Sequence, residues 1–481
     1  MKTFNKISLL FLALVAVVLS GCFKNFDELR EDPEAVSIAL PSSFLSNALY
    51  NATTTFATQG HTINDQLMQV NVLRQNDNEI HRYIILPGNF TGMWNPLYKP
   101  LVDLKEMQTL AAQRGDANYE AIGLTLTAWI MSNITDIYGD VPFTEALRGV
   151  EGLTTPKFDP QQQIYDSLFV YLEKANKLFV LNKVLGGEDL LYNSGTTAAN
   201  MLKWKKFTNS LRLRLLMRAE KKGAPYKDQI RAMLADPAKY PLMSSVADGA
   251  SLYYTNVTPF LNPFFSYRDF DFNEKLNYSD FFIEYLEAVG DPRLPVISTK
   301  TSGGEYKGVP TGYPVTQQNV ISNTSYSTYP ASFKSNNKMG SILQYAEVEF
   351  LLAEAVLKGF VTGNAKTHYD KGIKASMDYW GVTTIPAAFL AHPEIAYDGT
   401  MEQIITQKYF ALFTNGFDQW FEYRRTGYPV LTPGPEMQNN GVMPARIPYP
   451  LSESLYNSKN YEEAAARMGG DNMNSKVWWQ Q

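Results

Sequence analysis

The 481-residue chain contains a single cysteine, Cys22, and only four histidines. One thiol cannot form an internal disulfide, and it cannot supply a zinc site that is built from several thiolates. The histidines show neither an HExxH pattern nor a paired spacing typical of metal ligands; they are His61, His81, His368 and His392. We therefore predict no metal and no cofactor.

The common sequence signatures of enzymes are also missing. The chain has no G-x-S-x-G nucleophile elbow, no P-loop and no dinucleotide-binding fingerprint. We therefore do not expect an enzyme. The two carboxylates of a glycosidase carry no sequence signature, so a cryptic hydrolase of glycans remains an alternative at this point.

Basic residues are too few and too scattered for a nucleic-acid-binding protein. The chain has 43 Lys and Arg against 48 Asp and Glu, and the net charge falls from −5 to −7 if Lys2 and Lys6 are removed with a leader. No block of basic residues interrupts this acidic balance. A surface of this kind does not attract a polyanion, so we predict no nucleic-acid partner.

Long apolar runs are missing too, except at the N-terminus, where residues 7–19 are almost entirely apolar. As a helix this run would reach only ~20 Å, which is short against the ~30 Å hydrocarbon core of a bilayer. With Lys2 and Lys6 before it, the run is typical of a signal peptide, predicted over 1–21. The ending Leu-Ser-Gly-Cys resembles a bacterial lipobox, so we predict that Cys22 carries lipid and anchors the protein.

What the chain has in abundance is aromatic residues, which make up 13% of it and include 29 tyrosines. Many of them stand in polar stretches where core packing does not require them. Tyrosine combines a flat apolar face with a polar tip, which suits hydrated recognition surfaces.

Helical periodicity dominates the body of the protein. After a tether over 22–40, we predict one domain over 41–481, with a helical scaffold at about 41–236 and 341–430 and a C-terminal segment over 431–481. The helical segments are 41–57, 96–114, 118–135, 160–183, 200–221, 343–358, 364–380 and 400–424. The segments 343–358 and 364–380 are joined by a short turn, with small residues such as Gly372 at their crossing. This pair predicts a tetratricopeptide-like hairpin in an irregular superhelix.

The periodicity disappears over about 237–340, apart from one predicted helix at 279–289. Pro, Gly, Asn, Ser and aromatic residues replace it, as in "GEYKGVPTGYPVTQQNV". Irregular segments of this length in a compact protein are usually functional or disordered, and their tyrosines argue against disorder. The fold prediction is therefore mainly α, with an irregular, loop-rich and aromatic-rich part.

Six stretches occur in an order that resembles one protein family. They are "SNITDIYGDVPFTEAL", "KWKKFTNSLRLRLLMRA", "GDPRLP", "YAEVEFLLAEAVLKGF", "NGFDQWFEYRRTGYP" and "RIPYPLSE". With the lipobox, they resemble the SusD/RagB family of Bacteroidetes outer-membrane lipoproteins, in its second SusD-like branch, over residues 26–479. The resemblance implies a tetratricopeptide-like superhelix that supports an irregular half.

The resemblance also implies a function without catalysis. Members of this family act as lids on a SusC-like, TonB-dependent outer-membrane transporter, where they capture glycan or another nutrient. We accordingly expect a lipid-anchored protein on the cell surface. Alternatives at this point are a peptide-binding lid and, less in keeping with the resemblance, the cryptic hydrolase.

Several charged residues have a structural interpretation beside a chemical one. Asp136, Asp140 and Glu145 could form a catalytic carboxylate group, but the helix end at Gly139 and the turn beside Asp140 favour capping and turn hydrogen bonds. Glu347 and Glu354 share a helical face and could bind a metal. Ion pairs with Arg424 and Arg425 are the preferred interpretation, because buried carboxylates require partners. For Arg212, Arg214 and Arg218, contacts with helix ends and acids are preferred to an anion site.

One stretch has the spacing of a calcium loop. In "DFDFNEKLNYSD", Asp269, Asp271, Asn273 and Asp280 stand at positions 1, 3, 5 and 12. Glu274 occupies the sixth position, where the sharp turn of such a loop needs glycine. We therefore predict no metal here.

We place the ligand site where the helical scaffold meets the loop-rich segment, since scaffolds fix positions and loops supply chemistry. Trp94 is expected in a turn between Gly92 and Pro96, and the tyrosines of the loops are expected at the surface. The predicted ligand-binding residues are Trp94, Asn95, Tyr267, Arg268, Tyr313 and Tyr326. The aromatic rings would pack on sugar faces, while Asn95 and Arg268 would bind hydroxyl groups.

The lipobox interpretation predicts the outcome of Cys22→Ser. Serine cannot receive the diacylglycerol, so the variant should leave the membrane fraction and appear in the soluble fraction after cell lysis. Fractionation with detection by immunoblot measures this. A variant that stays in the membrane fraction to the same extent as the natural protein would contradict lipidation at Cys22.

Overall fold

The computed structural model describes residues 39–74, 80–314, 316 and 323–481. The chain divides into two compact units, 1–40 and 41–481. The predicted signal peptide, the lipid at Cys22 and all but the last two residues of the tether lie outside the described residues. The following description concerns residues 41–481.

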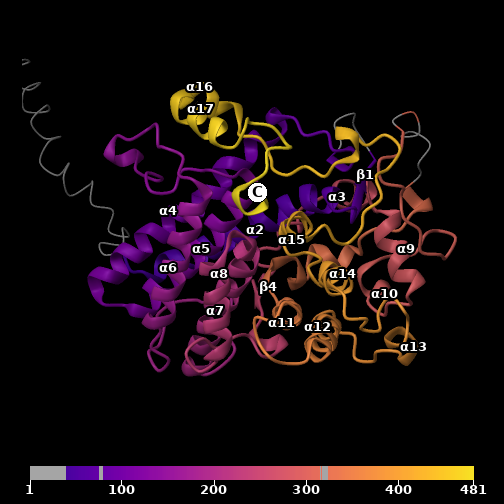
Figure 1. Ribbon diagram of the computed structural model, residues 1–481, viewed down its shortest axis with the longest axis horizontal. Helices are drawn as coiled ribbons and strands as arrows, with labels where there is room; N and C mark the ends of the chain where they lie inside the picture. Colours follow the sequence, from indigo (N-terminus) through magenta and orange to yellow (C-terminus); the bar gives the residue numbers. More distant parts are fainter. Residues whose placement is uncertain (1–38, 75–79, 315, 317–322) are drawn as a thin grey trace, which may run out of the picture. The chain divides into compact units, whose positions relative to one another are not determined.

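Long helices that pack on their neighbours along the chain make up the first half of this unit. They are α2 (Ser42–Gln59), α4 (Thr91–Arg114), α5 (Ala117–Tyr138), α6 (Gln161–Leu178), α7 (Thr197–Ala219) and α8 (Ala224–Ala235). Helix α2 packs on α4, and each helix from α4 to α8 packs on the next (Figure 1). This confirms the helices predicted over 41–221; α8, which follows a positive-φ Gly223, was not among them.

A second group of helices follows the irregular segment. Its members are α11 (Tyr345–Leu357), α12 (Ala365–Tyr379), α13 (Ala387–Leu390), α14 (Met401–Ala411), α15 (Asp418–Thr426), α16 (Leu451–Tyr456) and α17 (Ser458–Arg467). Helices α11 and α12 form the predicted hairpin (Figure 1). A Cβ on Gly372 would lie 2.8 Å from the ring of Phe350, so the small residue does permit the close crossing.

The single helix predicted over 400–424 is wrong, because the structure has two helices there. Between α14 and α15 the chain turns through Thr414 and Gly416, whose φ angles are 70° and 59°. A Cβ on Gly60 would lie 2.6 Å from the carbonyl oxygen of Gly416. The backbones of α2's C-terminal end and of this turn therefore approach each other too closely for a side chain at Gly60.

The segment over 237–340 is irregular, as predicted, and short strands fasten it to the scaffold. Strand β1 (Asn71–Leu73) pairs antiparallel with β3 (Leu276–Tyr278), and β2 (Ala250–Ser251) pairs antiparallel with β4 (Ser341–Leu343). Its helices are α9 (Asp280–Ala288), close to the predicted bounds, and α10 (Leu294–Ile297). The mainly α fold with an irregular half is thereby confirmed.

Buried ion pairs on α7 connect the two groups of helices. Arg218 contacts Asp136 of α5 at 2.6 Å and Asp418 of α15 at 2.9 Å. Arg214 contacts the same Asp418 at 3.1 Å and donates to Glu347 of α11, with Nε 2.7 Å from Oε1. All of these side chains are almost fully buried. The predicted use of these arginines, contacts with acids, is correct, and Asp136 is a buried ion-pair partner and not the cap that we predicted.

A second set of buried pairs joins α11, α14 and α15. Glu354 contacts Arg425 at 2.7 Å, which confirms that predicted pair, and Glu422 contacts both Arg425 at 2.6 Å and Lys408 at 2.8 Å. The arginine partner predicted for Glu347 was wrong, as its partner is Arg214. In these pairs each buried charge has a partner of opposite sign. The pairs also fix how the helices are oriented, which hydrophobic contacts alone would not do.

Arg424 and Asp140 have different surroundings. Arg424 lies over the ring of Trp420 at 3.9 Å and donates to the carbonyl oxygen of Asp136. Asp140 accepts from the backbone N–H of Gln161 at the start of α6, at 2.9 Å. The predicted capping role of Asp140 is therefore confirmed.

The Glu354–Arg425 pair makes the free energy of unfolding depend on pH in the acid range. Burial alone would raise the pKa of Glu354, but the guanidinium of Arg425 holds that pKa at about 2, below the ordinary 4.5. Because the pKa of Glu354 is lower in the folded state than in the unfolded state, the pair contributes fully to the free energy of unfolding above about pH 4.5. This contribution is lost as the pH falls toward 2, and amounts to about 3 kcal/mol.

We therefore expect Glu354→Gln to have a shallower pH dependence of the free energy of unfolding than the natural protein between pH 4.5 and 2. Urea unfolding at a series of pH values measures this. Glu463→Gln, which removes an exposed carboxylate on α17, is the control and should leave the slope unchanged. An unchanged slope in Glu354→Gln would contradict the role of the pair.

Candidate functional site

A cavity of about 760 Å³ lies where the scaffold meets the loop-rich segment. Its walls come from the chain before and within α7, from the segments around β2 and β4, and from the end of α12. Among the residues that line it are Tyr192, Lys203, Tyr253, Tyr254, Lys338 and Tyr379. This volume falls within the roughly 300–1,000 Å³ of small-molecule sites, so the cavity is large enough for a ligand.

The tyrosines of the cavity wall are held by contacts behind them. The hydroxyl of Tyr192 donates to the carbonyl oxygen of Asp248 at 3.0 Å, and its ring meets Trp204 edge to face. The hydroxyl of Tyr379 donates to the carbonyl oxygen of Lys338 at 3.2 Å. The wall is therefore preorganised, which lowers the entropic cost of binding.

The β2–β4 pair carries part of the same wall. Its register brings Ser251 close to Gln344, the residue before α11, and the Gln344 amide donates to the Ser251 hydroxyl at 2.6 Å. A Cβ on Gly249 would lie 2.5 Å from the side-chain oxygen of Gln344. Glycine at this position thus lets the amide approach the backbone and close the floor of the cavity.

Exposed aromatic rings are concentrated in one segment of the sequence, and one of them lines the cavity. In the part of the chain that the structure describes, five aromatic side chains are exposed, and four of them stand within 253–270. These four, which we call the aromatic run, are Tyr253, Phe265, Tyr267 and Phe270. Tyr253 is 58% exposed and also lines the cavity, so the run begins at its edge. Such a concentration of exposed rings is typical of a binding surface.

Two of the predicted ligand residues belong to this surface. Tyr267 is 38% exposed and meets the buried ring of Phe264 edge to face at 5.3 Å between centroids. Arg268 is exposed, contacts Asp271 at 2.6 Å and has its guanidinium over the ring of Phe270 at 5.9 Å. Their placement at the surface agrees with the prediction, and their contact with a ligand stays a prediction.

Tyr313 and Tyr326 lie together elsewhere, in a small apolar cluster with Val72 and Val309. The surface position that we predicted for Tyr313 is wrong, because it is only 1% exposed. Its ring is stacked on His81, with centroids 5.3 Å apart, and the guanidinium of Arg82 lies 4.8 Å from it. These partners on the N-terminal side of the chain supply the packing that the local sequence does not reveal.

Tyr326 is half-buried, with the Lys307 ammonium 5.6 Å from its ring centre. Its carbonyl oxygen accepts from the side-chain amide of Asn277 on β3 at 3.3 Å. The ring thus retains some exposure, and its ligand role stays a prediction.

The turn predicted around Trp94 is also wrong. Trp94 and the exposed Asn95 lie within α4, which runs through Pro96. Trp94 is 7% exposed and its ring meets Tyr138 edge to face at 4.9 Å. Burial of a large ring outweighs the local preference of proline for a turn. Trp94 nevertheless borders a cavity of about 260 Å³ beside α16, so its ligand role stays a prediction.

The sequence analysis missed most of the cavity and part of the aromatic run. Phe265 and Phe270 could have been found from the dense aromatics of "NPFFSYRDF", where Tyr267 was the only ring chosen. Lys203 and Tyr379 stand in ordinary helical sequence, and no local signal marks them. Only the fold brings them opposite the loops.

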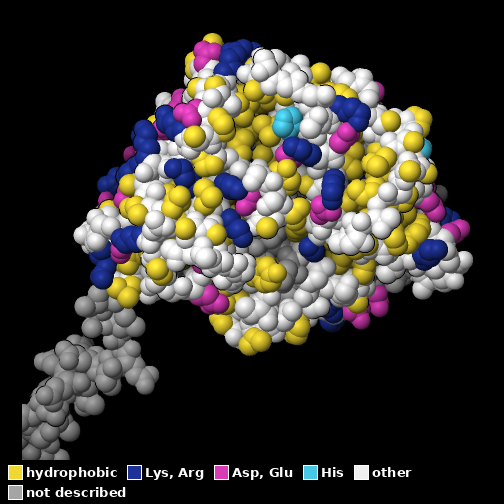
Figure 2. Space-filling view, turned by 90° about the horizontal axis from the view of Figure 1, so that it is seen from below, with side chains coloured by type: hydrophobic (Ala, Val, Ile, Leu, Met, Phe, Trp, Pro, Cys, Tyr) yellow, Lys and Arg dark blue, Asp and Glu magenta, His cyan; other side chains and the backbone are white. Residues whose placement is uncertain are grey.

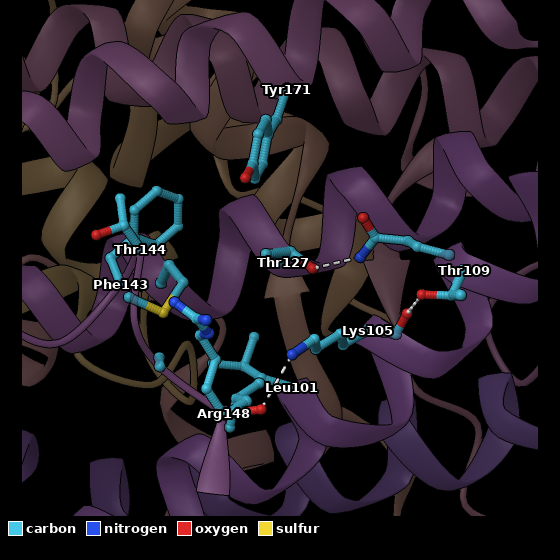
Figure 3. A pocket seen from close by; sticks show the side chains of 12 residues that line it. Leu101, Lys105, Thr109, Thr127, Phe143, Thr144, Arg148 and Tyr171 are labelled. Atoms are coloured by element: carbon cyan, nitrogen blue, oxygen red, sulfur yellow. Dashed lines mark hydrogen bonds between the residues drawn. The ribbon is translucent and has the colours of Figure 1, made fainter. Parts of the chain in front are cut away.

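A second cavity, of about 290 Å³, lies between α4, α5 and the segment 143–148 (Figure 3). Many of its polar groups are bonded to one another. The Lys105 ammonium donates to the carbonyl oxygen of Leu147 at 3.0 Å, and the Gln108 amide donates to the Thr127 hydroxyl at 2.9 Å. These internal bonds leave fewer groups for a ligand than the larger cavity offers.

The carboxylates of the calcium-like stretch have separate partners. Asp271 contacts Arg268 and Lys275, Asp269 contacts Lys334, and Asp280 accepts from backbone N–H groups at the start of α9. Among the described residues, no group of three His, Cys, Asp or Glu side chains is placed to hold a metal ion.

Charges of both signs are interspersed on the face that Figure 2 shows, together with scattered hydrophobic side chains. No described helix has both the length and the apolar character that crossing a membrane requires.

Comparisons with known proteins agree on one family. The family model for SusD-like proteins described as "Starch-binding associating with outer membrane" matches residues 33–450. Among solved structures, a SusD homologue from Bacteroides fragilis is 26% identical, with a TM-score of 0.78 over 92% of this chain and 100% of that one. A chitin-binding protein is 27% identical, with a TM-score of 0.78 over 92% and 99% of the two chains.

An outer membrane protein from Bacteroides vulgatus is 26% identical, with a TM-score of 0.79 over 92% of this chain and 100% of that one. None of the curated proteins matches. The family model covers most of the chain, and the structures agree with it in fold over nearly their whole length. The chain therefore belongs to the SusD-like family of outer-membrane-associated binding proteins.

Proposed function

We propose that this protein captures glycans at the cell surface and acts as the lid of a TonB-dependent outer-membrane transporter. The observation that carries the binding part is the aromatic run, a set of four exposed rings of which Tyr253 also lines the 760 Å³ cavity. The C–H faces of sugars pack on such rings, and each ring contributes about 0.5–1.5 kcal/mol beyond its buried area. Micromolar affinity, about −8 kcal/mol, thus requires several rings together.

The similar chitin-binding protein supports a glycan as the ligand class. The lining of the cavity supports binding without catalysis. The common mechanism of glycosidases uses two carboxyl groups that flank the bond to be cleaved. The described residues that line the cavity include no Asp and no Glu. A glycan bound there would meet hydroxyl, amide and ammonium groups, which can hold it but cannot cleave it by that mechanism.

The lid part of the proposal rests on membership of the family, which is described as associating with the outer membrane. A lipid at Cys22 would keep the protein at that membrane. Closure over a transporter would then be a rigid-body movement of one packed protein on another, without rearrangement of the buried ion-pair network.

Ring removal tests the binding surface. We expect Tyr267→Ala and Phe270→Ala each to weaken glycan binding by about threefold to tenfold, with unchanged melting temperature, because both rings are exposed. Calorimetric titration, with the strongest ligand found on a glycan array, measures this. Leu455→Ala removes an exposed apolar side chain on α16 that lines none of these cavities and is the control. Wild-type affinity in both variants of the run would place the site elsewhere.

Gentle extraction tests the lid. A stable complex should bury well over about 1,000 Å², so the protein, purified from its own membranes in mild detergent, should bring a TonB-dependent transporter with it. Mass spectrometry of the purified material identifies the partner. Recovery of the lipoprotein alone under several mild detergents, while other membrane complexes survive, would contradict the lid.

A further inference from the structure

We propose that the 760 Å³ cavity binds a negatively charged sugar unit, whose carboxylate or sulfate group is held by Lys203 and Lys338. This inference rests on the proposed function, since it names the class of glycan that the site takes. The aromatic run would hold neighbouring sugar units by their apolar faces, and the cavity would select for charge.

The charges of the cavity are all of one sign. Among the described residues that line it, Lys203 and Lys338 are charged, and no carboxylate is present. The protein as a whole has more acidic than basic residues. A concave surface with positive charge only therefore departs from the balance of the chain and raises the local concentration of anions.

Neither lysine has a carboxylate partner. Lys203 stands in the second turn of α7, where its ammonium lies 5.9 Å from the ring centre of Tyr192. The ammonium of Lys338 donates to the carbonyl oxygen of Tyr379 and lies 4.1 Å from that ring. No carboxylate oxygen lies within 4.0 Å of either ammonium in the described structure. Both cations retain donors for an anion, since an ammonium has three N–H groups.

The acidic residues behind the wall are already neutralised or bonded. Asp248 contacts Lys206 at 2.8 Å and also accepts from the backbone of Ser244. Asp189 accepts from the indole N–H of Trp204 at 2.7 Å and from the backbone N–H of Leu191 and Tyr192. Neither carboxylate lines the cavity, so neither takes the place of an anionic ligand.

The other cavities show that this arrangement is not general in the protein. In the cavity of Figure 3, Arg148 contacts Glu151 at 2.7 Å, and Lys105 lies 4.0 Å from the same residue. A cavity of about 450 Å³ beside Tyr192 is lined by Glu188 and Asp189 and by no Lys or Arg. Among its described residues, the wall of the cavity in Figure 3 also has cations and no Asp or Glu, so of these three cavities only the large one has lysines in its wall without a carboxylate partner.

Partial burial strengthens the expected preference for an anion. Burial lowers the pKa of Lys338, because its ammonium loses hydration in the wall. An anionic ligand would restore the favourable interactions that this ammonium has lost. A neutral sugar would offer it hydroxyl groups only, and hydrogen bonds with charge on both sides are the stronger ones.

The test compares ligands of the same shape and different charge. The probes are tetragalacturonate, its fully methyl-esterified form, and a sulfated tetrasaccharide, titrated into the full protein by calorimetry. We expect the acid to bind at least about fivefold more tightly than the ester. The preference should decrease as sodium chloride is raised. Comparison of the uronate with the sulfated probe distinguishes the two sources of negative charge.

Substitutions of the two lysines test whether they cause the preference for the acidic probe. Lys203→Gln and Lys338→Gln should each reduce it, and Lys203→Glu should remove it, as measured by the ratio of the affinities for the acid and for the neutral ester. Lys205→Gln, on the same helix and not in the cavity wall, is the matched control. Melting temperatures show whether a variant has lost its fold. If Lys338→Gln has lost it, the variants of Lys203 alone test the inference.

The outcomes separate this inference from the proposed function. Equal binding of acid and ester, or a preference that survives Lys203→Glu, would overturn the inference and leave glycan binding intact. Binding to none of the neutral, uronate or sulfated sugars of a broad glycan array would overturn glycan binding itself, and the inference with it. A preference that Lys203→Gln reduces and Lys205→Gln does not would support the inference.

Discussion

The pairing of Arg214 and Arg218 with acids from three other helices is the constraint on which the rest of this structure depends. Asp418 receives both guanidinium groups, and Asp136 lies on the far side of Arg218. Each of these charges would cost several kcal/mol if left alone in the interior. Helices α5, α7, α11 and α15 must therefore meet in one arrangement, and that arrangement connects the helices before the irregular segment with those after it.

One of these helices, α7, and the residue that precedes another, α11, also contribute to the wall of the cavity. Helix α7 has its buried arginines in its second half and presents Lys203 near its start, while α11 begins directly after Gln344. Strand pairs fasten the irregular segment, β2–β4 near its two ends and β1–β3 near its middle. Other aromatic residues of the segment, among them Phe264, Phe272 and Phe282, belong to the main core, and the rings of the aromatic run are those that remain exposed.

Much of this fold could be predicted from sequence, because helical periodicity and short-range pairs are local. The α11–α12 hairpin was found in that way, whereas the Glu354–Arg425 pair joins residues 71 positions apart and was predicted because buried carboxylates require partners. Glu347 was given the wrong partner because Arg214 lies 133 positions away and only packing brings them together. Tyr313 and Trp94 stand in sequences that resemble surface turns, yet distant residues cover both. The site was predicted least well, since Lys203 and Tyr379 of its wall stand in ordinary helical sequence.

In the proposed site, aromatic rings and cations without a carboxylate partner would divide the work of recognition between them. A ring accepts the apolar face of many sugars, so the aromatic run would supply affinity with little selectivity. A charge in a concave wall discriminates strongly, because an unsuitable neutral unit leaves the ammonium without the anion that would complete its interactions. Selectivity of this kind requires a rigid wall, since a mobile lysine could turn toward water instead. The buried arginines of α7 therefore bear on the cavity as well, by fixing the helix from which Lys203 extends.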